Sequence, residues 1–196
     1  MRRLLLDFGG VVIKTPFELL HRIGSPGWTG PFDPTGDDLW REMQTGGITE
    51  RHYWHTRASQ AFPEDEDPVT VLMDRLFAPP SDEVVRPQIR TLIDETAPAV
   101  LTNDLARFHP PEWLERMELA GSFEPLIDLS FTGFLKPSED AYRHALEVLG
   151  SPADEVVFVD DQPLNITGAT RFGLRTVWFD VTDPGGSVSR IREAIR

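Results

Sequence analysis

Short apolar runs that end in polar or glycine residues recur along the chain and predict the strands of a sheet. They occupy residues 3–6, 99–101, 126–131, 155–159 and 175–179. Continuous apolar strands are typical of a parallel sheet that is buried on both faces. From residue 81 onward, helically spaced apolar positions lie between the runs, at residues 81–96, 111–120, 138–149 and 165–172. This alternation predicts a three-layer, Rossmann-like α/β core with right-handed crossovers.

Residues 14–80 follow a different pattern. They contain helical patches at residues 17–23, 37–44, 50–60 and 69–77, no convincing strand, and frequent glycine and proline. Because this segment lies between the first two strands and is longer than a crossover needs, it predicts a helical insertion above the sheet. We therefore expect an α/β core of residues 1–13 and 81–196 and a small helical cap of residues 14–80.

Composition narrows the classes of function. The 196 residues carry 19 Lys and Arg against 32 Asp and Glu, a net charge of −13, which disfavours nucleic acids and anionic membranes as partners. Cysteine is absent, so disulfides and cysteine nucleophiles are excluded. The first apolar stretch stops at Asp7, too early for a signal peptide or a membrane span, and we expect a cytoplasmic protein. No pattern in the sequence indicates an oligomeric state.

Chemically useful side chains follow four of the predicted strands. Asp7 follows the first, Thr102 the second, Lys136 comes shortly after the third, and Asp160 and Asp161 follow the fourth. The carboxyl ends of parallel strands lie at the same edge of a sheet, and ligands bind there. We therefore expect these residues to form one site.

Three of these residues also have a purely structural explanation. Asp7 can cap a loop, Thr102 and the two residues after it can cap the next helix, and Lys136 can be a solvated loop residue. However, Lys136 is one of only two lysines among the 19 basic residues. A lysine kept where arginine is the rule favours a role for a compact point charge.

The acidic pair Asp160 and Asp161 has a structural explanation as a hydrated turn, but adjacent carboxylates at a dry strand end repel each other. A divalent cation relieves this repulsion, and Mg²⁺ prefers oxygen ligands of this kind. Together with Asp7 as a nucleophile, and with Thr102 and Lys136 to bind an anion, the pair is suited to metal-assisted phosphoryl transfer.

Four motifs carry these residues in a recognisable order. They are residues 4–12 (Leu-Leu-Leu-Asp-Phe-Gly-Gly-Val-Val), residues 100–103, residues 135–137, and residues 159–161 with Asn165 and residues 168–169 downstream. In this order the chain resembles the haloacid dehalogenase superfamily over nearly its whole length. The insertion is similar to the helical C1-type cap of that superfamily, including the Gly-Gly-Ile-Thr stretch at residues 46–49.

The resemblance implies a role for each motif residue. Asp7 would attack phosphorus and become an aspartyl-phosphate, while Thr102 and the backbone of Asn103 would hold the phosphate. Lys136 would neutralise Asp7 and the phosphate. Mg²⁺ would be bound by Asp7, the main-chain carbonyl of Gly9 and Asp160, and by Asp161 either directly or through water. The implied substrate is a small phosphorylated metabolite.

One position departs from the superfamily's pattern. Its phosphatases usually carry a second Asp two residues after the nucleophile as general acid and base, and here that residue is Gly9. Loss of such a group costs roughly 10²–10⁴ in rate. The Asp-x-Gly form resembles a subgroup with sugar-1-phosphate phosphatases and epoxide-hydrolase-like phosphatase domains. We therefore expect good leaving groups, such as anomeric or acyl phosphates, to be preferred over simple alkyl phosphates.

Two other functions remain open at this point. A 2-haloacid dehalogenase would use the same Asp without Mg²⁺, although such enzymes usually lack the acidic pair. A catalytically impaired binding or regulatory protein is supported by Gly9 alone.

The sequence also offers weaker candidates in and around the cap. We name Trp28, Arg41, His52 and Trp54 as candidate cap residues that face the substrate. His52 and His55 are expected to pack within the cap, and His109 and His144 to lie at the surface.

Overall fold

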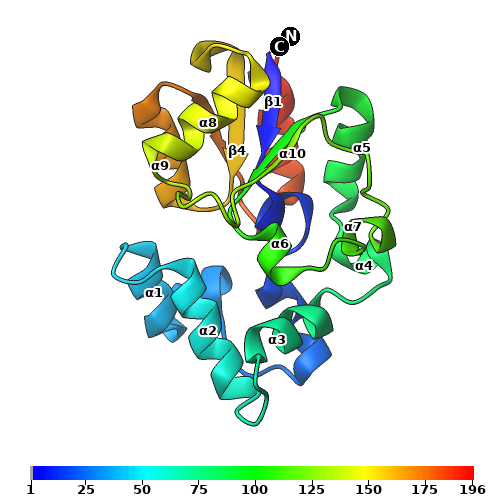
Figure 1. The fold of residues 1–196 in the computed structure, drawn as a ribbon, viewed down its shortest axis with the longest axis vertical. Coiled ribbons are helices and arrows are strands. Elements are labelled where there is room, and N and C mark those ends of the chain that lie inside the picture. Colours follow the sequence, from blue (N-terminus) through cyan, green and yellow to red (C-terminus); the bar gives the residue numbers. More distant parts are fainter. Residues whose placement is uncertain (1) are drawn as a thin grey trace.

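The computed structural model describes residues 2–196, and within them five strands form one parallel sheet (Figure 1). The strand order is β3–β2–β1–β4–β5, so β1 is central. The predicted parallel α/β fold is confirmed. The strands are β1 (Arg3–Leu6), β2 (Ala99–Thr102), β3 (Leu126–Asp128), β4 (Val156–Asp160) and β5 (Arg175–Trp178).

Helices cover both faces of the sheet, which is why the inner strands are almost entirely apolar and buried, whereas the edge strand of residues 175–178 is partly exposed. Leu5 packs in a cluster with residues of α8 (Glu139–Leu149) and α9 (Pro163–Phe172) on one face. Leu4 and Leu6 point the other way, into a cluster with α5 (Pro87–Thr96) and α10 (Pro184–Ala194). The alternation of neighbouring leucines between two cores follows from the two-residue period of a strand.

The helical segment of residues 14–80, between β1 and α4 (Ser81–Val84), lies at the carboxyl edge of the sheet (Figure 1). Side chains cap three helices of this segment by accepting from backbone N–H groups, as expected for N-terminal caps. Asp37 accepts from Trp40 N–H, Thr49 from His52 N–H and Asp67 from Thr70 N–H. The helices are η2 (Pro16–Ile23), η3 (Gly30–Phe32), η4 (Pro34–Gly36), α1 (Asp38–Gln44), α2 (Glu50–Ala61) and α3 (Pro68–Leu76).

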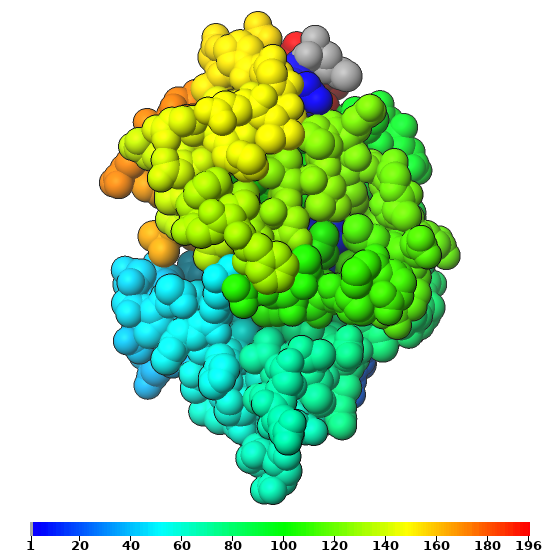
Figure 2. All heavy atoms as spheres, in the orientation of Figure 1, coloured from blue at the N-terminus to red at the C-terminus, as the bar shows by residue number. Residues whose placement is uncertain are grey.

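Packed aromatic rings hold this segment together. Phe17, Trp40, Tyr53 and Trp54 contact one another with ring centroids 4.9–6.0 Å apart. The buried carboxylate of Asp37 accepts a 2.8 Å hydrogen bond from the Tyr53 hydroxyl. In Figure 2 the atoms of this segment, in blue and cyan, touch those of the core.

The prediction of one continuous helix over residues 81–96 is wrong, because the helix is interrupted at Val85 and Arg86. It forms α4 (Ser81–Val84) and α5, and Val85 pairs with Ile13 in an isolated antiparallel bridge. Arg86 is buried: its Nε donates to the Gly10 carbonyl at 2.9 Å, and its terminal nitrogens donate to both carboxylate oxygens of Glu18. These long-range bonds fix the turn that follows β1, η1 (Phe8–Val12), whose backbone is not helical at Gly9 and Gly10.

Other elements differ from the prediction in length. The strand predicted over residues 126–131 ends at Asp128, and the helix predicted over 111–120 shrinks to α7 (Trp113–Arg116), because Glu118 has a left-handed backbone with φ of 56°. The helix α10 was not predicted, since its first turn is Pro-Gly-Gly; the Asp183 carboxylate caps it by accepting from Gly186 N at 3.0 Å. The remaining short helices are α6 (Leu105–Phe108) and η5 (Ala153–Glu155).

Across residues 2–196, every helix is too short or too polar to cross a membrane.

Candidate active site

The residues at the strand ends converge at the carboxyl edge of the sheet. The Lys136 ammonium donates to Asp7 Oδ1 at 2.6 Å and to Asp160 Oδ2 at 2.8 Å. Carboxylate oxygens of Asp7, Asp160 and Asp161 lie within 4.8 Å of one another. The sheet register brings these groups together: Leu6 pairs with Val159, and the Asp7 N–H donates to the Val159 carbonyl at 2.8 Å.

The Asp160 carboxylate is held by several donors besides Lys136. The Gln162 N–H donates to Oδ1 at 2.8 Å, and Asn165 Nδ2 lies 3.1 Å and 3.0 Å from the two oxygens. Asn165 is fixed in turn, because its carbonyl accepts a 2.7 Å hydrogen bond from the Tyr142 hydroxyl. Asp160 is therefore a fully oriented, completely buried carboxylate.

The cluster has more negative than positive charge. Burial raises the pKa of Asp7 to about 7, against the opposing effect of Lys136. Burial, together with the charges of Asp160 and Asp7, also raises the pKa of Asp161 well above its usual value. Burial alone would lower the pKa of Lys136, but the two carboxylates outweigh it and raise that pKa. Three carboxylates around one ammonium are a donor set suited to a divalent cation.

The two glycines after Asp7 are under different constraints. Gly10 has φ of 75°, and a Cβ there would lie 2.5 Å from Asp161 Oδ2, so glycine lets the turn pass directly against Asp161. Gly9 has an ordinary backbone, with φ of −66° and ψ of 136°, and a Cβ there would meet no described atom within 4 Å. The backbone and the space at position 9 would therefore accept an aspartate, so no steric constraint explains the glycine there.

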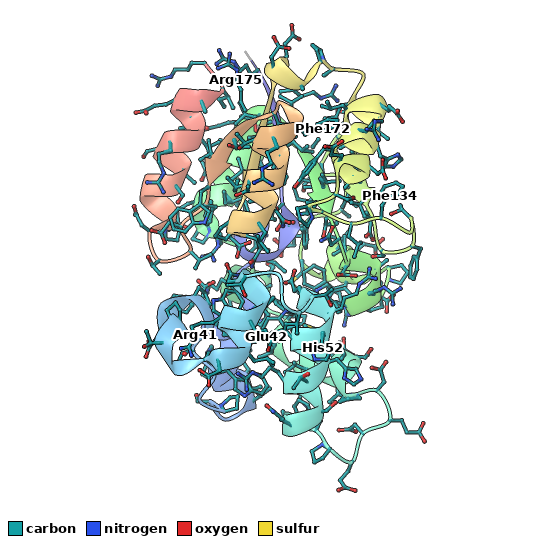
Figure 3. All side chains as sticks on the ribbon, turned by 90° about the vertical axis from the view of Figure 1, so that its left-hand side faces the viewer. Arg41, Glu42, His52, Phe134, Phe172 and Arg175 are labelled. Atoms are coloured by element: carbon teal, nitrogen blue, oxygen red, sulfur yellow. The ribbon has the colours of Figure 1, made fainter. Side chains whose placement is uncertain are left out.

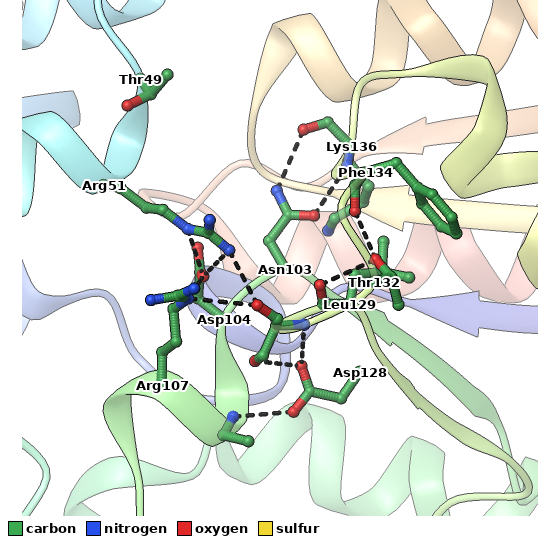
Figure 4. A network of polar contacts seen from close by, with 12 residues as sticks. Thr49, Arg51, Asn103, Asp104, Arg107, Asp128, Leu129, Thr132, Phe134 and Lys136 are labelled. Carbon is green, nitrogen blue, oxygen red and sulfur yellow. Dashed lines mark hydrogen bonds and ion pairs between the residues drawn. The ribbon is translucent and has the colours of Figure 1, made fainter.

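Thr102 and Asn103 lie beside this cluster and line the same cavity. The Asn103 side chain is bonded to the backbone of Lys136 in both directions: Nδ2 donates to the carbonyl at 3.2 Å, and Oδ1 accepts from the N–H at 2.9 Å (Figure 4). Asn103 therefore positions Lys136 through its side chain, and only its backbone is free to face an anion. The helix expected to begin here is short, since α6 has four residues.

Asp104 joins the core to the cap. Its carboxylate accepts from Arg51 Nε of α2 at 2.7 Å and lies 3.6 Å from Arg107 Nε (Figure 4). The expected helix-capping hydrogen bond is absent from Asp104 within residues 2–196. A second link joins Gln44 Nε2 to Gln162 Oε1 at 2.6 Å. These contacts hold the cap over the strand ends.

A cavity of about 90 Å³ lies between the cap and the strand ends. Its polar end is lined by Asp7, Thr102, Asn103, Asp104, Lys136, Asp161, Gln162 and Asn165. Its other walls are largely apolar, and they come from both cap and core: Ile13, Phe17, Trp40, Trp54, Met73, Phe77, Leu105 and Phe108.

Of the four cap residues predicted to face the substrate, one lines the cavity. Trp54 lines the cavity, whereas Trp28 does not. Arg41 and His52 are exposed on the cap helices and lie outside the cavity (Figure 3). His55 is exposed as well, so the expectation that His52 and His55 pack within the cap is wrong. Sequence reasoning missed Glu50, the first residue of α2, which lines the cavity.

The prediction that His109 lies at the surface is also wrong. Its ring is 8% exposed, lines the cavity and stacks on Trp113 at a centroid distance of 4.0 Å. Within residues 2–196, no hydrogen bond partner reaches Nδ1. Burial, with a contribution from the charge of Arg116, lowers the pKa of His109 to about 3. The imidazole is therefore neutral over the physiological range.

Because His109 gains a proton only on unfolding, its contribution to stability should be lost as the pH falls below the unfolded-state pKa of about 6.5. We expect the free energy of unfolding to drop by about 2 kcal/mol from this residue between about pH 8 and pH 5. His109→Gln should remove that part of the pH dependence, as measured by urea unfolding. The half-exposed His144→Gln variant is the control, and equal pH dependence in wild type and His109→Gln would contradict the assignment.

Comparison with models of known protein families shows which family has this sequence pattern. Residues 5–173, which include all the strand-end residues, match the model of haloacid dehalogenase-like hydrolases. The chain belongs to the haloacid dehalogenase-like hydrolase family. The superfamily that the four motifs suggested is thereby confirmed.

Two curated relatives of this hydrolase illustrate how far the likeness extends. It is 22% identical over 198 residues to the drimenol cyclase DrtB of Aspergillus calidoustus, covering 93% of this chain and 35% of that protein. It is 35% identical over 69 residues to the glyceraldehyde 3-phosphate phosphatase of Pyrococcus abyssi, covering 35% of this chain and 29% of that protein. The chain thus spans about a third of the length of these curated relatives.

Solved structures share the fold of this hydrolase. A dehalogenase crystal structure with an intermediate complex aligns with a TM-score of 0.64 at 20% identity, covering 92% of this chain and 85% of that one. The Bacillus subtilis HAD-hydrolase YfnB bound to magnesium aligns with a TM-score of 0.63 at 19% identity, covering 91% and 86%. At such identities the likeness concerns the fold alone.

Proposed function

We propose that this hydrolase is a Mg²⁺-dependent phosphatase that acts on a small phosphorylated molecule through an aspartyl-phosphate on Asp7. The observation that carries the proposal is the grouping of Asp7, Asp160 and Asp161 within 4.8 Å, beside the single ammonium of Lys136. A phosphatase among the curated relatives and a magnesium-bound structural neighbour support it.

Asp7 has one carboxylate oxygen free for attack. Oδ1 accepts from the Phe8 N–H at 2.7 Å and from Lys136 Nζ at 2.6 Å, whereas no hydrogen bond from residues 2–196 reaches Oδ2. Oδ2 would form a bond to phosphorus while the bond from phosphorus to the substrate oxygen breaks. Lys136 offsets the charge that would otherwise repel an anionic phosphate from Asp7.

Phosphate and metal would be held by the residues around Asp7. The Thr102 hydroxyl, the Asn103 backbone N–H and the Lys136 ammonium are the proposed phosphate ligands. Asp7, Asp160, Asp161 and the carbonyl of Gly9 are the proposed metal ligands. When bound there, Mg²⁺ supplies positive charge to the phosphoryl oxygens and lowers the barrier to attack.

The apolar walls of the cavity indicate which substrates fit. Besides Lys136, no cationic side chain lines the cavity within the described part of the chain, and Asp104 adds negative charge. A leaving group with a second negative charge is therefore disfavoured, while an uncharged, apolar one gains about 0.8 kcal/mol for each CH₂ buried. Sugar 1-phosphates, the substrate class that the Asp-x-Gly motif implies, are a narrower alternative within the proposed phosphatase function.

The test is a hydrolysis panel with and without Mg²⁺. We expect phosphate release that EDTA abolishes, with kcat/KM about tenfold higher for butyl phosphate than for ethyl phosphate, because two more CH₂ groups are buried. Acyl, sugar-1- and carboxylate-bearing phosphates complete the panel. Absence of Mg²⁺-dependent release from every member would refute the phosphatase, and kcat/KM that falls with alkyl length would refute the apolar specificity.

A 2-haloacid dehalogenase is the second candidate, because a dehalogenase aligns over 92% of this chain and the cavity is apolar. The acidic pair Asp160 and Asp161 favours the phosphatase, since attack on carbon needs no metal. Release of halide from 2-haloacids in the presence of EDTA would reverse this preference. A binding protein without turnover would instead retain Mg²⁺ affinity and hydrolyse no phosphate ester.

A further inference from the structure

The proposed reaction requires a proton for the leaving oxygen, and Gly9 has no side chain to provide it. The donor must therefore be another group that reaches the cavity. The titratable side chains that line it, within the part of the chain the structure describes, are Asp7, Glu50, Asp104, His109, Lys136 and Asp161.

Three of these groups belong to the charged cluster. Asp7 is the nucleophile, and Asp161 lies with it among the proposed metal ligands. Lys136 is bonded through Nζ to two carboxylates, so removal of its proton would leave both without their cation. None of the three is free to donate a proton to a leaving group.

Two further groups are excluded by their surroundings. Asp104 accepts from Arg51 Nε at 2.7 Å and lies 3.6 Å from Arg107 Nε, so its side chain is already paired with two guanidinium groups. His109 is buried against Trp113, which keeps its imidazole neutral with no acidic proton to give. Glu50 is the group that remains.

Glu50 stands where a donor is needed. It is the first residue of α2, between Thr49, whose side chain caps the helix, and Arg51, whose side chain reaches the core at Asp104 (Figure 4). It comes from the cap, whereas Asp7 comes from the sheet, and both line the cavity. A substrate between them would have its phosphate at the sheet and its leaving oxygen toward the cap.

The environment of Glu50 favours the protonated acid. Its carboxyl accepts one long hydrogen bond, 3.3 Å from Trp54 Nε1, and no ion pair to it exists within residues 2–196. Burial raises its pKa, and the charge of Asp104 adds to the effect; Asp160 acts in the same direction, while Lys136 opposes it. A carboxyl that keeps its proton closer to neutral pH is a suitable general acid.

We propose that Glu50 is the general acid and base of this hydrolase, in place of the residue missing at position 9; this rests on the proposed phosphatase function. As Asp7 Oδ2 bonds to phosphorus, the bond from phosphorus to the leaving oxygen breaks, and the Glu50 proton passes to that oxygen. Glu50 becomes a carboxylate. It then takes a proton from water as the water oxygen bonds to phosphorus and the bond to Asp7 breaks, which restores both residues.

The test compares Glu50→Gln with wild type on butyl phosphate and on 4-nitrophenyl phosphate, whose leaving group needs no proton. In the first turnover, measured by rapid quench, Glu50→Gln should slow butyl phosphate cleavage about 10²-fold or more and 4-nitrophenyl phosphate cleavage hardly at all. In the steady state the second step lacks its base, so 4-nitrophenol should appear as a burst of one equivalent followed by slow release.

Two further variants separate a chemical role from a structural one. Glu42→Gln changes an exposed acid of the cap helix α1 and should leave all rates unchanged. Gly9→Asp fits the ordinary backbone and open space at position 9, and in the Glu50→Gln background it should restore butyl phosphate cleavage.

Each result decides between distinct claims. Equal slowing of both substrates by Glu50→Gln, or no slowing of either, overturns the role of Glu50 and leaves the phosphatase standing. Wild type inactive on both substrates with Mg²⁺ overturns the phosphatase and the role of Glu50 together. Gly9 by itself predicts a strong preference for good leaving groups over alkyl phosphates. With Glu50 as the proton donor, this preference is weaker in wild type, and it becomes strong in Glu50→Gln.

Discussion

The Asp7→Asn variant is expected to lose the Mg²⁺-dependent phosphatase activity by about 10⁴-fold or more, because removal of a covalent nucleophile has effects of this order. An amide does not form the acyl-phosphate bond that the reaction requires. The side chain keeps its shape, and its oxygen can still accept from Lys136 and from the Phe8 N–H. Phosphate release from butyl phosphate is the measurement, and acid-quenched intact-protein mass spectrometry should find a phosphorylated species in wild type only.

The matched control for this variant is Asp38→Asn, which changes an exposed acid of α1. It should hydrolyse the same substrate at the wild-type rate. If Asp7→Asn and wild type turned over equally, the nucleophile would be a different group and the proposed mechanism would be wrong.

Lys136→Met should have the largest effect on stability. The substitution keeps the length of the side chain but leaves the buried carboxylates of Asp7 and Asp160 without their ammonium. Loss of one partner from a buried ion pair costs about 3–5 kcal/mol. We expect a decrease of that size in the free energy of unfolding, measured by urea denaturation without Mg²⁺.

The chain offers a close control, because its other lysine, Lys14, is half-exposed. Lys14→Met should change stability by no more than about 0.5 kcal/mol. Adding Asp7→Asn to Lys136→Met should recover part of the loss, since one of the unpaired carboxylates is then gone. A double variant less stable than Lys136→Met would show that uncompensated charge is not the cause.

The charged half of the site could be predicted because it depends on strand ends. Asp7, Thr102 and Asp160 each follow a short run of buried apolar residues, and parallel strands align their carboxyl ends. A polar residue at the end of such a run is therefore expected at the carboxyl edge of the sheet.

Contacts over long sequence distances explain where prediction failed. The helical spacing of residues 81–96 is real, but Pro87 disfavours a helical conformation at Arg86, and the extended Arg86 bonds to Gly10 and Glu18. The spacing of apolar residues carries no information on partners some 70 positions away.

The cavity walls show the same limit. His109 is buried because Trp113 and Phe77 pack on its ring, and Phe77 comes from the end of the cap segment. Glu50 reaches the cavity because of how α2 docks on the core. Neither orientation has a local signal, since each depends on the placement of one folded segment against another.

The two chain ends lie together at the opposite edge of the sheet from the cap (Figure 1). The Arg2 N–H donates to the Ile195 carbonyl at 2.9 Å, and its guanidinium donates to the Ala194 carbonyl at 2.8 Å. A tether at either end would therefore anchor the molecule by its base, with the strand-end cluster turned away from the support. Immobilised protein should consequently bind small molecules as freely as protein in solution.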